Sequence, residues 1–96
     1  MEITKEQRHS IYIAALAFYK NRISEGNYFG FCDALESVAS KLLGWDNYPD
    51  PYIEMEAYPE IFKHRPDNSD GYWFDKYGDG VKKRIAIFEE AIELTK

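Results

Sequence analysis

The stretch from Gly44 to Gly80 constrains the fold of this chain more than any other, because it interrupts helix formation. It contains all four prolines and four of the six glycines in the 96-residue sequence. Proline lacks the amide donor that a helix interior needs, and the residue before a proline avoids the helical region. We therefore expect the long helices to lie outside this stretch, with mostly extended or turning backbone within it.

The same stretch is rich in aromatic side chains. Nine of the sixteen lie between Trp45 and Tyr77. Disordered segments are poor in aromatics, and each buried ring removes roughly 150–250 Å² of surface from water. We therefore expect this long connection to be ordered and to lie across the helices, held there by its rings.

Helical patterns fill the chain on either side. Apolar residues recur three and four apart from Lys5 to Ser24, where Thr4 and Gln7 form a capping-box pattern and Gly26 provides a stop. A second helix is expected over residues 30–43, from this apolar stripe: Phe31, Ala34, Leu35, Val38, Ala39, Leu42 and Leu43. The short loop between them predicts antiparallel neighbours.

Two further helices are expected after residue 58. Pro59 fits the first turn of a short helix over residues 59–64. The last helix is expected over residues 80–95, with an apolar stripe that Ile87 and Leu94 broaden. Because a chain of this length has room for one core, residues 1–96 are predicted to form a single mainly α domain. It is a small bundle of three helices with a long, ordered, aromatic-rich connection.

Cysteine use and hydropathy predict a cytoplasmic protein. Cys32 is the only cysteine, so the chain forms no internal disulfide, as is usual in a reducing compartment. The N-terminal residues lack the pattern of a secretory signal. The longest apolar run, from Ile13 to Phe18, is far shorter than the roughly 20 residues of a membrane helix. We expect no contact with a membrane.

The negative charge is concentrated in one segment. The formal net charge is −5, and the segment from Trp45 to Glu60 contains no Lys or Arg. Its acidic residues are Asp46, Asp50, Glu54, Glu56 and Glu60. Binding to a nucleic-acid backbone requires a basic face, so we expect no direct binding to DNA or RNA. Metal ions or a basic partner suit the segment better than nucleic acid does, and a solvated acidic loop suits it best.

No pattern predicts a metal, a cofactor or a catalytic residue. The motif DKYGDG from Asp75 to Gly80 resembles the start of a calcium loop, but Tyr77 replaces an oxygen ligand and Ala86 stands where glutamate is required. Neither histidine has a second ligand type at metal spacing, and the lone cysteine has no CxxC partner. We expect neither metal nor cofactor.

Arg84 lies on the border of the apolar stripe of the last helix. Its stem can cover apolar surface while its guanidinium stacks on Trp73 or Tyr72, or pairs with a carboxylate of the acidic segment. A structural tie between the connection and the last helix is the preferred interpretation. A clamp for a ligand is the alternative.

Three motifs occur in order: GFCDAL from Gly30 to Leu35, YPEIF from Tyr58 to Phe62 and GYWF from Gly71 to Phe74, followed by Arg84. In this order they resemble a group of small uncharacterised proteins common in phage and prophage genomes. The resemblance covers roughly residues 30–92. It implies a host–phage or mobile-element context and brings no activity with it.

We expect a non-enzymatic interaction protein that contacts a protein partner through the exposed part of residues 45–77. The candidate partner-binding residues are Trp45, Tyr48, Tyr52, Glu54, Glu56, Tyr72, Trp73 and Arg84. Three alternatives remain open. They are an acidic mimic of nucleic acid, a small-molecule binder or enzyme with a pocket near Trp73 and Arg84, and a homodimer.

Overall fold

The computed structural model of the protein describes residues 2–27, 30–63 and 79–96. Its three long helices are α1 (Lys5–Ser24), α2 (Phe31–Leu43) and α4 (Asp79–Leu94). The 3₁₀ turn η1 (Met55–Ala57) and the single-turn helix α3 (Pro59–Phe62) lie between α2 and α4 in the chain. These described ranges contain no strand. The prediction of a mainly α domain with three long helices is confirmed.

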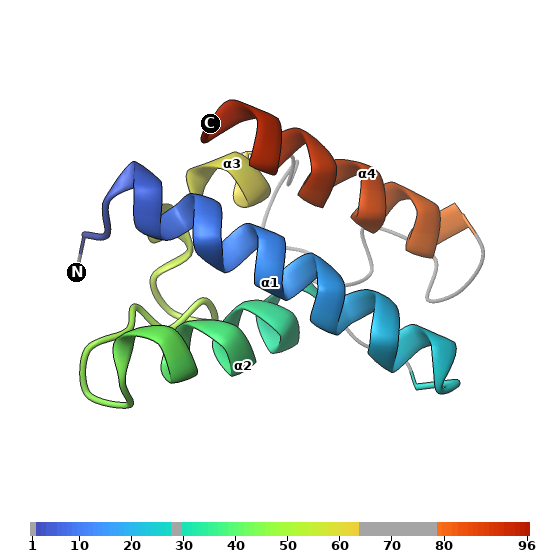
Figure 1. The fold of residues 1–96 in the computed structure, drawn as a ribbon, viewed down its shortest axis with the longest axis horizontal. Helices are drawn as coiled ribbons and strands as arrows, with labels where there is room; N and C mark the ends of the chain where they lie inside the picture. The colour runs from blue at the N-terminus through green and yellow to red at the C-terminus, as the bar shows by residue number, and fades with distance from the viewer. Residues whose placement is uncertain (1, 28–29, 64–78) are drawn as a thin grey trace.

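Helix α1 occupies the centre of the arrangement. It packs against α2 on one side and against α4 on the other, and both run in the direction opposite to α1 (Figure 1). The short helix α3 packs against α4 and is adjacent to η1. The antiparallel pairing of α1 with α2 is what the short connection between them predicts.

The ends of α1 follow the pattern in the sequence. At its start, the Gln7 N–H donates to Thr4 Oγ1 at 3.0 Å, and the Thr4 N–H donates to Gln7 Oε1 at 2.8 Å. At its end, Gly26 has a φ of 84° and its N–H donates to the carbonyl of Ile23 at 2.9 Å. Because both ends are closed by local hydrogen bonds, the helix has the same bounds as predicted.

Three aromatic rings join the three long helices. The ring of Phe88 on α4 lies edge-on to Phe31 of α2, with centroids 5.2 Å apart, and tilted against Tyr19 of α1 at 5.9 Å. All three side chains are buried. Around them the core contains Ile3, Ile11, Tyr12, Ala15, Leu16, Ala34, Leu35, Val38, Ala39, Tyr58, Ile61 and Ala91.

The other helices differ from the predicted bounds only at their ends. Gly30 directly precedes α2, and its N–H donates to Asp33 Oδ2 at 3.3 Å. Helix α3 ends at Phe62, within the predicted range 59–64. The expectation that Leu94 broadens the buried face of α4 is wrong, because its side chain is 45% exposed. The next residue, Thr95, is the buried one.

The start of α1 and the end of α4 are in contact at this residue. The Oγ1 of Thr95 donates to the carbonyl of Ala91 at 2.8 Å and lies 3.0 Å from Nδ1 of His9. Since a hydroxyl has one proton, His9 Nδ1 is the donor to Oγ1 when Thr95 bonds to Ala91.

No helix in the described part of the chain is long and apolar enough to cross a membrane.

Candidate binding surface

The segment that follows α2 is fixed to the rest of the fold by hydrogen bonds that the carbonyls of its two prolines accept. We call residues 45–54 the prolyl loop. The carbonyl of Pro49 accepts a 2.5 Å hydrogen bond from the hydroxyl of Tyr58, and the carbonyl of Pro51 accepts the Sγ–H of Cys32 at 3.7 Å. Both prolines are buried. The loop is therefore held from the first turn of α2 and from the residue that precedes α3.

These two contacts also give a structural role to two of the quoted motifs. Cys32 belongs to the GFCDAL motif and Tyr58 to the YPEIF motif. Both side chains hold the same turn of the chain, one from each side. The GYWF motif lies outside the described residues.

The tip of the prolyl loop is a tight turn that begins at Asp50. Its Oδ1 accepts the N–H of Tyr52 at 2.9 Å, and its carbonyl accepts the N–H groups of Ile53 and Glu54 at 3.0 and 2.6 Å. The side chain of Ile53 is 77% exposed and that of Tyr52 is 53% exposed. The Tyr52 hydroxyl donates to a carboxylate oxygen of Asp33 on α2. An apolar tip is thus presented to solvent in a defined position.

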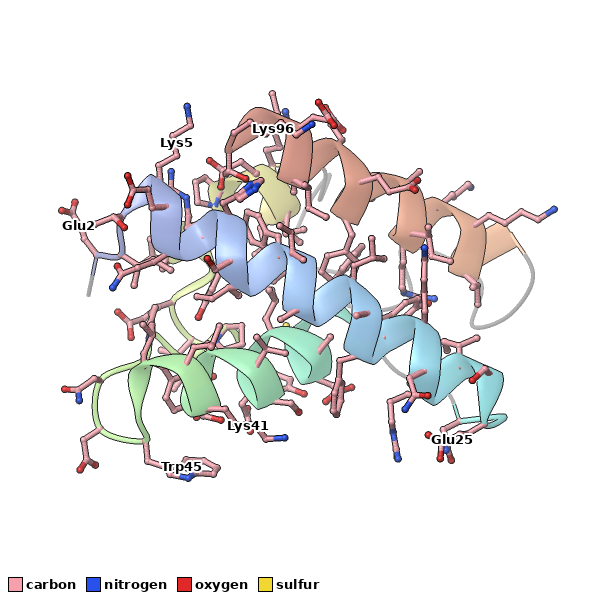
Figure 2. All side chains as sticks on the ribbon, in the orientation of Figure 1. Glu2, Lys5, Glu25, Lys41, Trp45 and Lys96 are labelled. Atoms are coloured by element: carbon pink, nitrogen blue, oxygen red, sulfur yellow. The ribbon has the colours of Figure 1, made fainter. Side chains whose placement is uncertain are left out.

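Trp45 lies at the other end of the prolyl loop. Its side chain is 75% exposed, and Figure 2 shows it at the margin of the molecule beyond the end of α2. The half-buried ring of Tyr48 lies edge-on to it, with centroids 6.0 Å apart. Leu42, in the last turn of α2, is 55% exposed. The aromatic residues predicted for binding in this part of the chain are therefore near the surface.

Glu54 and Glu56, two of the predicted partner-binding residues, lie on a helical turn: Glu54 directly precedes η1 and Glu56 lies within it. Residues two apart point in different directions on a helical turn. Arg84 is 1% exposed, so it lies inside the fold and not on the surface formed by the prolyl loop. Burial of that extent fits the structural interpretation of Arg84.

The remaining predicted residues, Tyr72 and Trp73, lie outside the described part of the chain. One exposed residue was missed: Ile53 was not among the candidates, although its side chain is more exposed than that of Trp45. The signal was present in the sequence. Ile53 follows a Pro-Asp-Pro-Tyr turn and precedes an acidic pair, where an apolar residue has little opportunity to reach the core.

The electrostatic field around the prolyl loop is negative. Asp46 and Glu56 are exposed, and Glu36 on α2 is half-buried. Burial raises the pKa of Tyr48, and the carboxylates of Glu36 and Asp50 raise it further. The pKa of Tyr52 is raised by burial and by its hydrogen bond to Asp33. Both phenols therefore remain protonated at neutral pH.

Two lysines near the prolyl loop make contacts with other parts of the molecule. The ammonium of Lys41 on α2 lies 5.6 Å from the centre of the Phe18 ring on α1. Lys63, after α3, pairs with Glu90 of α4 at 3.4 Å. Neither cation comes from the prolyl loop, which itself contains no Lys or Arg.

Glu60 must be removed from the acidic set, because it is part of the helix packing. Its Oε1 accepts hydrogen bonds from Arg8 Nε at 2.9 Å and from the Tyr12 hydroxyl at 2.8 Å, and its Oε2 accepts Arg8 Nη2 at 3.2 Å. Burial raises the pKa of Glu60, but the hydrogen bonds from Tyr12 and Arg8 outweigh burial and lower it overall. This carboxylate joins α1 to α3.

Among the described residues, no three His, Cys, Asp or Glu side chains gather as a metal site requires. Comparison of the chain with protein-family models, curated proteins and solved structures gave no match. Inferences about function therefore rest on the geometry and charge of this surface.

Proposed function

We propose that this chain is a small non-enzymatic binding protein that contacts a protein partner through the prolyl loop. The observation that supports this is the exposure of Trp45, Tyr52 and Ile53, at 75%, 53% and 77%. Single exposed apolar residues are common on any protein. Three large ones within nine consecutive residues are a concentration, and Trp and Tyr are the residue types that dominate binding energy in protein interfaces.

The rigidity of the loop favours this use. Tyr58, Cys32 and Asp33 hold it at three points, and the turn at Asp50 sets its tip. A surface that is ordered before binding loses less conformational entropy when the partner docks. The contacts therefore present exposed side chains in one arrangement, which is the property a recognition surface needs.

The motif resemblance supports a setting for this function. A phage or mobile-element accessory factor would act by binding a host protein, with no chemistry of its own. A second copy of the chain is an alternative occupant of the same surface, and the oligomeric state of the purified protein distinguishes it.

The test compares partners captured from a lysate of the source cells by the wild type and two double variants. In Trp45→Ala/Ile53→Ser the exposed apolar side chains of the prolyl loop are removed. In Ile13→Ser/Leu94→Ser two exposed apolar side chains are removed from α1 and α4, where they are 48% and 45% exposed. Circular dichroism confirms that each variant is helical.

We expect the loop variant to bind at least one partner roughly 30-fold or more weakly, since the loss of even one central anchor costs about 2 kcal/mol. The control variant should capture the same proteins as the wild type. Retention of every partner by the loop variant would contradict the proposal. So would equal losses in both variants, because a general loss of apolar surface would then explain them.

A further inference from the structure

We infer that the partner segment recognised by the prolyl loop is cationic and amphipathic, with Lys or Arg beside large apolar side chains. This inference depends on the proposed function and specifies the chemistry of its partner. It rests on the combination of exposed apolar groups with a field of one sign on the same short loop.

The charge on this surface is not neutralised from within the loop. Asp46 is exposed next to Trp45, and Glu56 is exposed three residues after Ile53. No cation occurs anywhere between Trp45 and Glu60. The neighbouring cation on α2, Lys41, lies over the ring of Phe18 on α1. A partner with positive charges would thus meet complementary groups, and an acidic partner would be repelled.

The apolar groups decide between two kinds of basic partner. A protein that binds nucleic acid does so through phosphate contacts made by Lys and Arg. A mimic of nucleic acid needs carboxylates for such a partner and has no use for Trp45 and Ile53, which are 75% and 77% exposed. Large apolar side chains among acidic groups instead match a segment with an apolar face flanked by basic side chains, as a basic amphipathic helix has.

The experiment uses three synthetic peptides of about 14 residues, long enough to form a helix on binding. The first places Leu on one face and Lys on the other. The second replaces every Lys with Glu, and the third replaces every Leu with Ser. Binding is followed by ¹H–¹⁵N NMR of the whole chain, using the indole N–H of Trp45, which is assigned from its absence in Trp45→Phe.

The Lys/Leu peptide should shift the indole resonance of Trp45 and the backbone amides of residues 45–56. The Glu/Leu and Lys/Ser peptides should bind at least about tenfold more weakly. Raising the salt concentration should weaken the Lys/Leu peptide severalfold, because charges are screened beyond about 8 Å at physiological ionic strength. Equal binding of the Glu/Leu peptide would overturn the charge assignment. Equal binding of the Lys/Ser peptide would overturn the apolar one and favour a mimic of nucleic acid.

A charge variant provides the matched control. The variant Asp46→Asn/Glu56→Gln removes one charge from the prolyl loop and one charge two residues after it. The control variant Glu6→Gln/Glu89→Gln removes two exposed charges from α1 and α4. The first should weaken the Lys/Leu peptide by roughly threefold or more, and the second should leave its affinity unchanged. Equal effects of the two variants would show that only net charge matters.

The two proposals fail in different ways. If lysate partners are lost by Trp45→Ala/Ile53→Ser but retained by Asp46→Asn/Glu56→Gln, the binding surface is correct and the cationic partner is wrong. If the Trp45→Ala/Ile53→Ser variant retains every partner, the binding surface itself is wrong.

Discussion

Glu60 shows how the role of one side chain depends on contacts distant in sequence. In the sequence it is the last of five acidic residues in a segment without cations. In the fold, its carboxylate is 15% exposed and accepts hydrogen bonds from Arg8 and Tyr12. Arg8 also donates to the carbonyl of Ile3 at 2.9 Å, which joins the chain before α1 to the same cluster. Glu60 is thus structural, whereas Asp46 and Glu56 of the same segment are exposed.

Replacing Glu60 with Gln should reduce the free energy of unfolding by about 1–3 kcal/mol at neutral pH, because the charge-assisted hydrogen bonds with Arg8 are lost. Glu56→Gln, the same chemical change at an exposed position, should change it by less than about 0.5 kcal/mol. Urea denaturation followed by circular dichroism measures both. Equal effects of the two substitutions would contradict the structural role of Glu60.

Comparison of the wild type with Glu60→Gln at different pH values tests the direction in which the pKa of Glu60 is shifted. The pKa is lowered in the folded state, so the ionised carboxylate stabilises the fold above the pKa of the unfolded chain, about 4.3. That stabilisation is lost as pH falls through the lower folded pKa. The difference in unfolding free energy between wild type and Glu60→Gln should therefore be constant near pH 7 and shrink below about pH 4.3. A difference that grows with acidification would have the wrong sign.

The sequence predicts the ends of the helices well. Two helices end at a glycine, α1 at Gly26 and α2 at Gly44, and the backbone conformations of these two glycines differ. Gly26 closes α1 at a φ of 84°, and its neighbour Asn27 donates its N–H to the carbonyl of Arg22 at 3.2 Å. Gly44 closes α2 at φ 93° and ψ 151°. The first pattern is the common left-handed helix end. The second lies in a region that only glycine occupies readily.

We therefore expect Gly44→Ala to destabilise the protein more than Gly26→Ala, by roughly 2–3 against about 1 kcal/mol. An added Cβ at Gly26 meets no atom within 4 Å, and at Gly44 it meets Asn47 Nδ2 at 3.4 Å, an ordinary contact. The difference thus arises from the backbone. Since both substitutions restrict the unfolded chain equally, the difference between the two urea-derived free-energy changes isolates this effect. A larger loss at Gly26 would be inconsistent with these dihedral angles.

Local patterns predict helices well because each helix is specified by residues three and four apart. The stripe of α2 and the capping box of α1 needed no information from elsewhere in the chain. The expectations that failed concern packing between elements. Thr95 lies four residues after Ala91 and seven after Phe88, so it continues the spacing of the buried residues of α4, whereas Leu94 falls outside that spacing. The apolar character of Leu94 was misleading, and the contact of Thr95 with His9 of α1 joins opposite ends of the sequence.

The binding surface was predicted in part for the same reason. Composition located Trp45, Tyr48 and Tyr52 in the acidic and aromatic segment, and these residues are near the surface. It could not exclude Arg84, which is 1% exposed, because the depth of a residue at the border of a stripe is set by what covers it. Composition alone did not indicate Ile53 either; its exposure follows from the turn at Asp50, for which the signal is the local order Pro-Asp-Pro-Tyr.

In the described part of the molecule, a helical frame is combined with residues 45–63, which buried rings attach to it. Tyr58 and Ile61 are fully buried beside α1 and α4 core residues, and the Tyr58 hydroxyl fixes Pro49. Residues 45–63 therefore join the frame through buried groups, in spite of their few regular helical turns. A segment attached in this way should open together with the frame and not before it.

Amide hydrogen exchange tests this cooperativity. The N–H of Ile61 donates to the carbonyl of Tyr58 at 3.1 Å, and that of Tyr58 to Met55 at 3.0 Å. Both amides should exchange with a free energy within about 1 kcal/mol of Ala15, a fully buried residue of α1 that reports global unfolding. Tyr58→Phe removes the hydrogen bond to Pro49, so it should lower protection of the Ile53 amide more than that of Ala15. If the amides of Ile61 and Tyr58 exchange at the rate of an unfolded peptide while Ala15 stays protected, the connection is not part of the folded unit and cannot present a fixed binding surface.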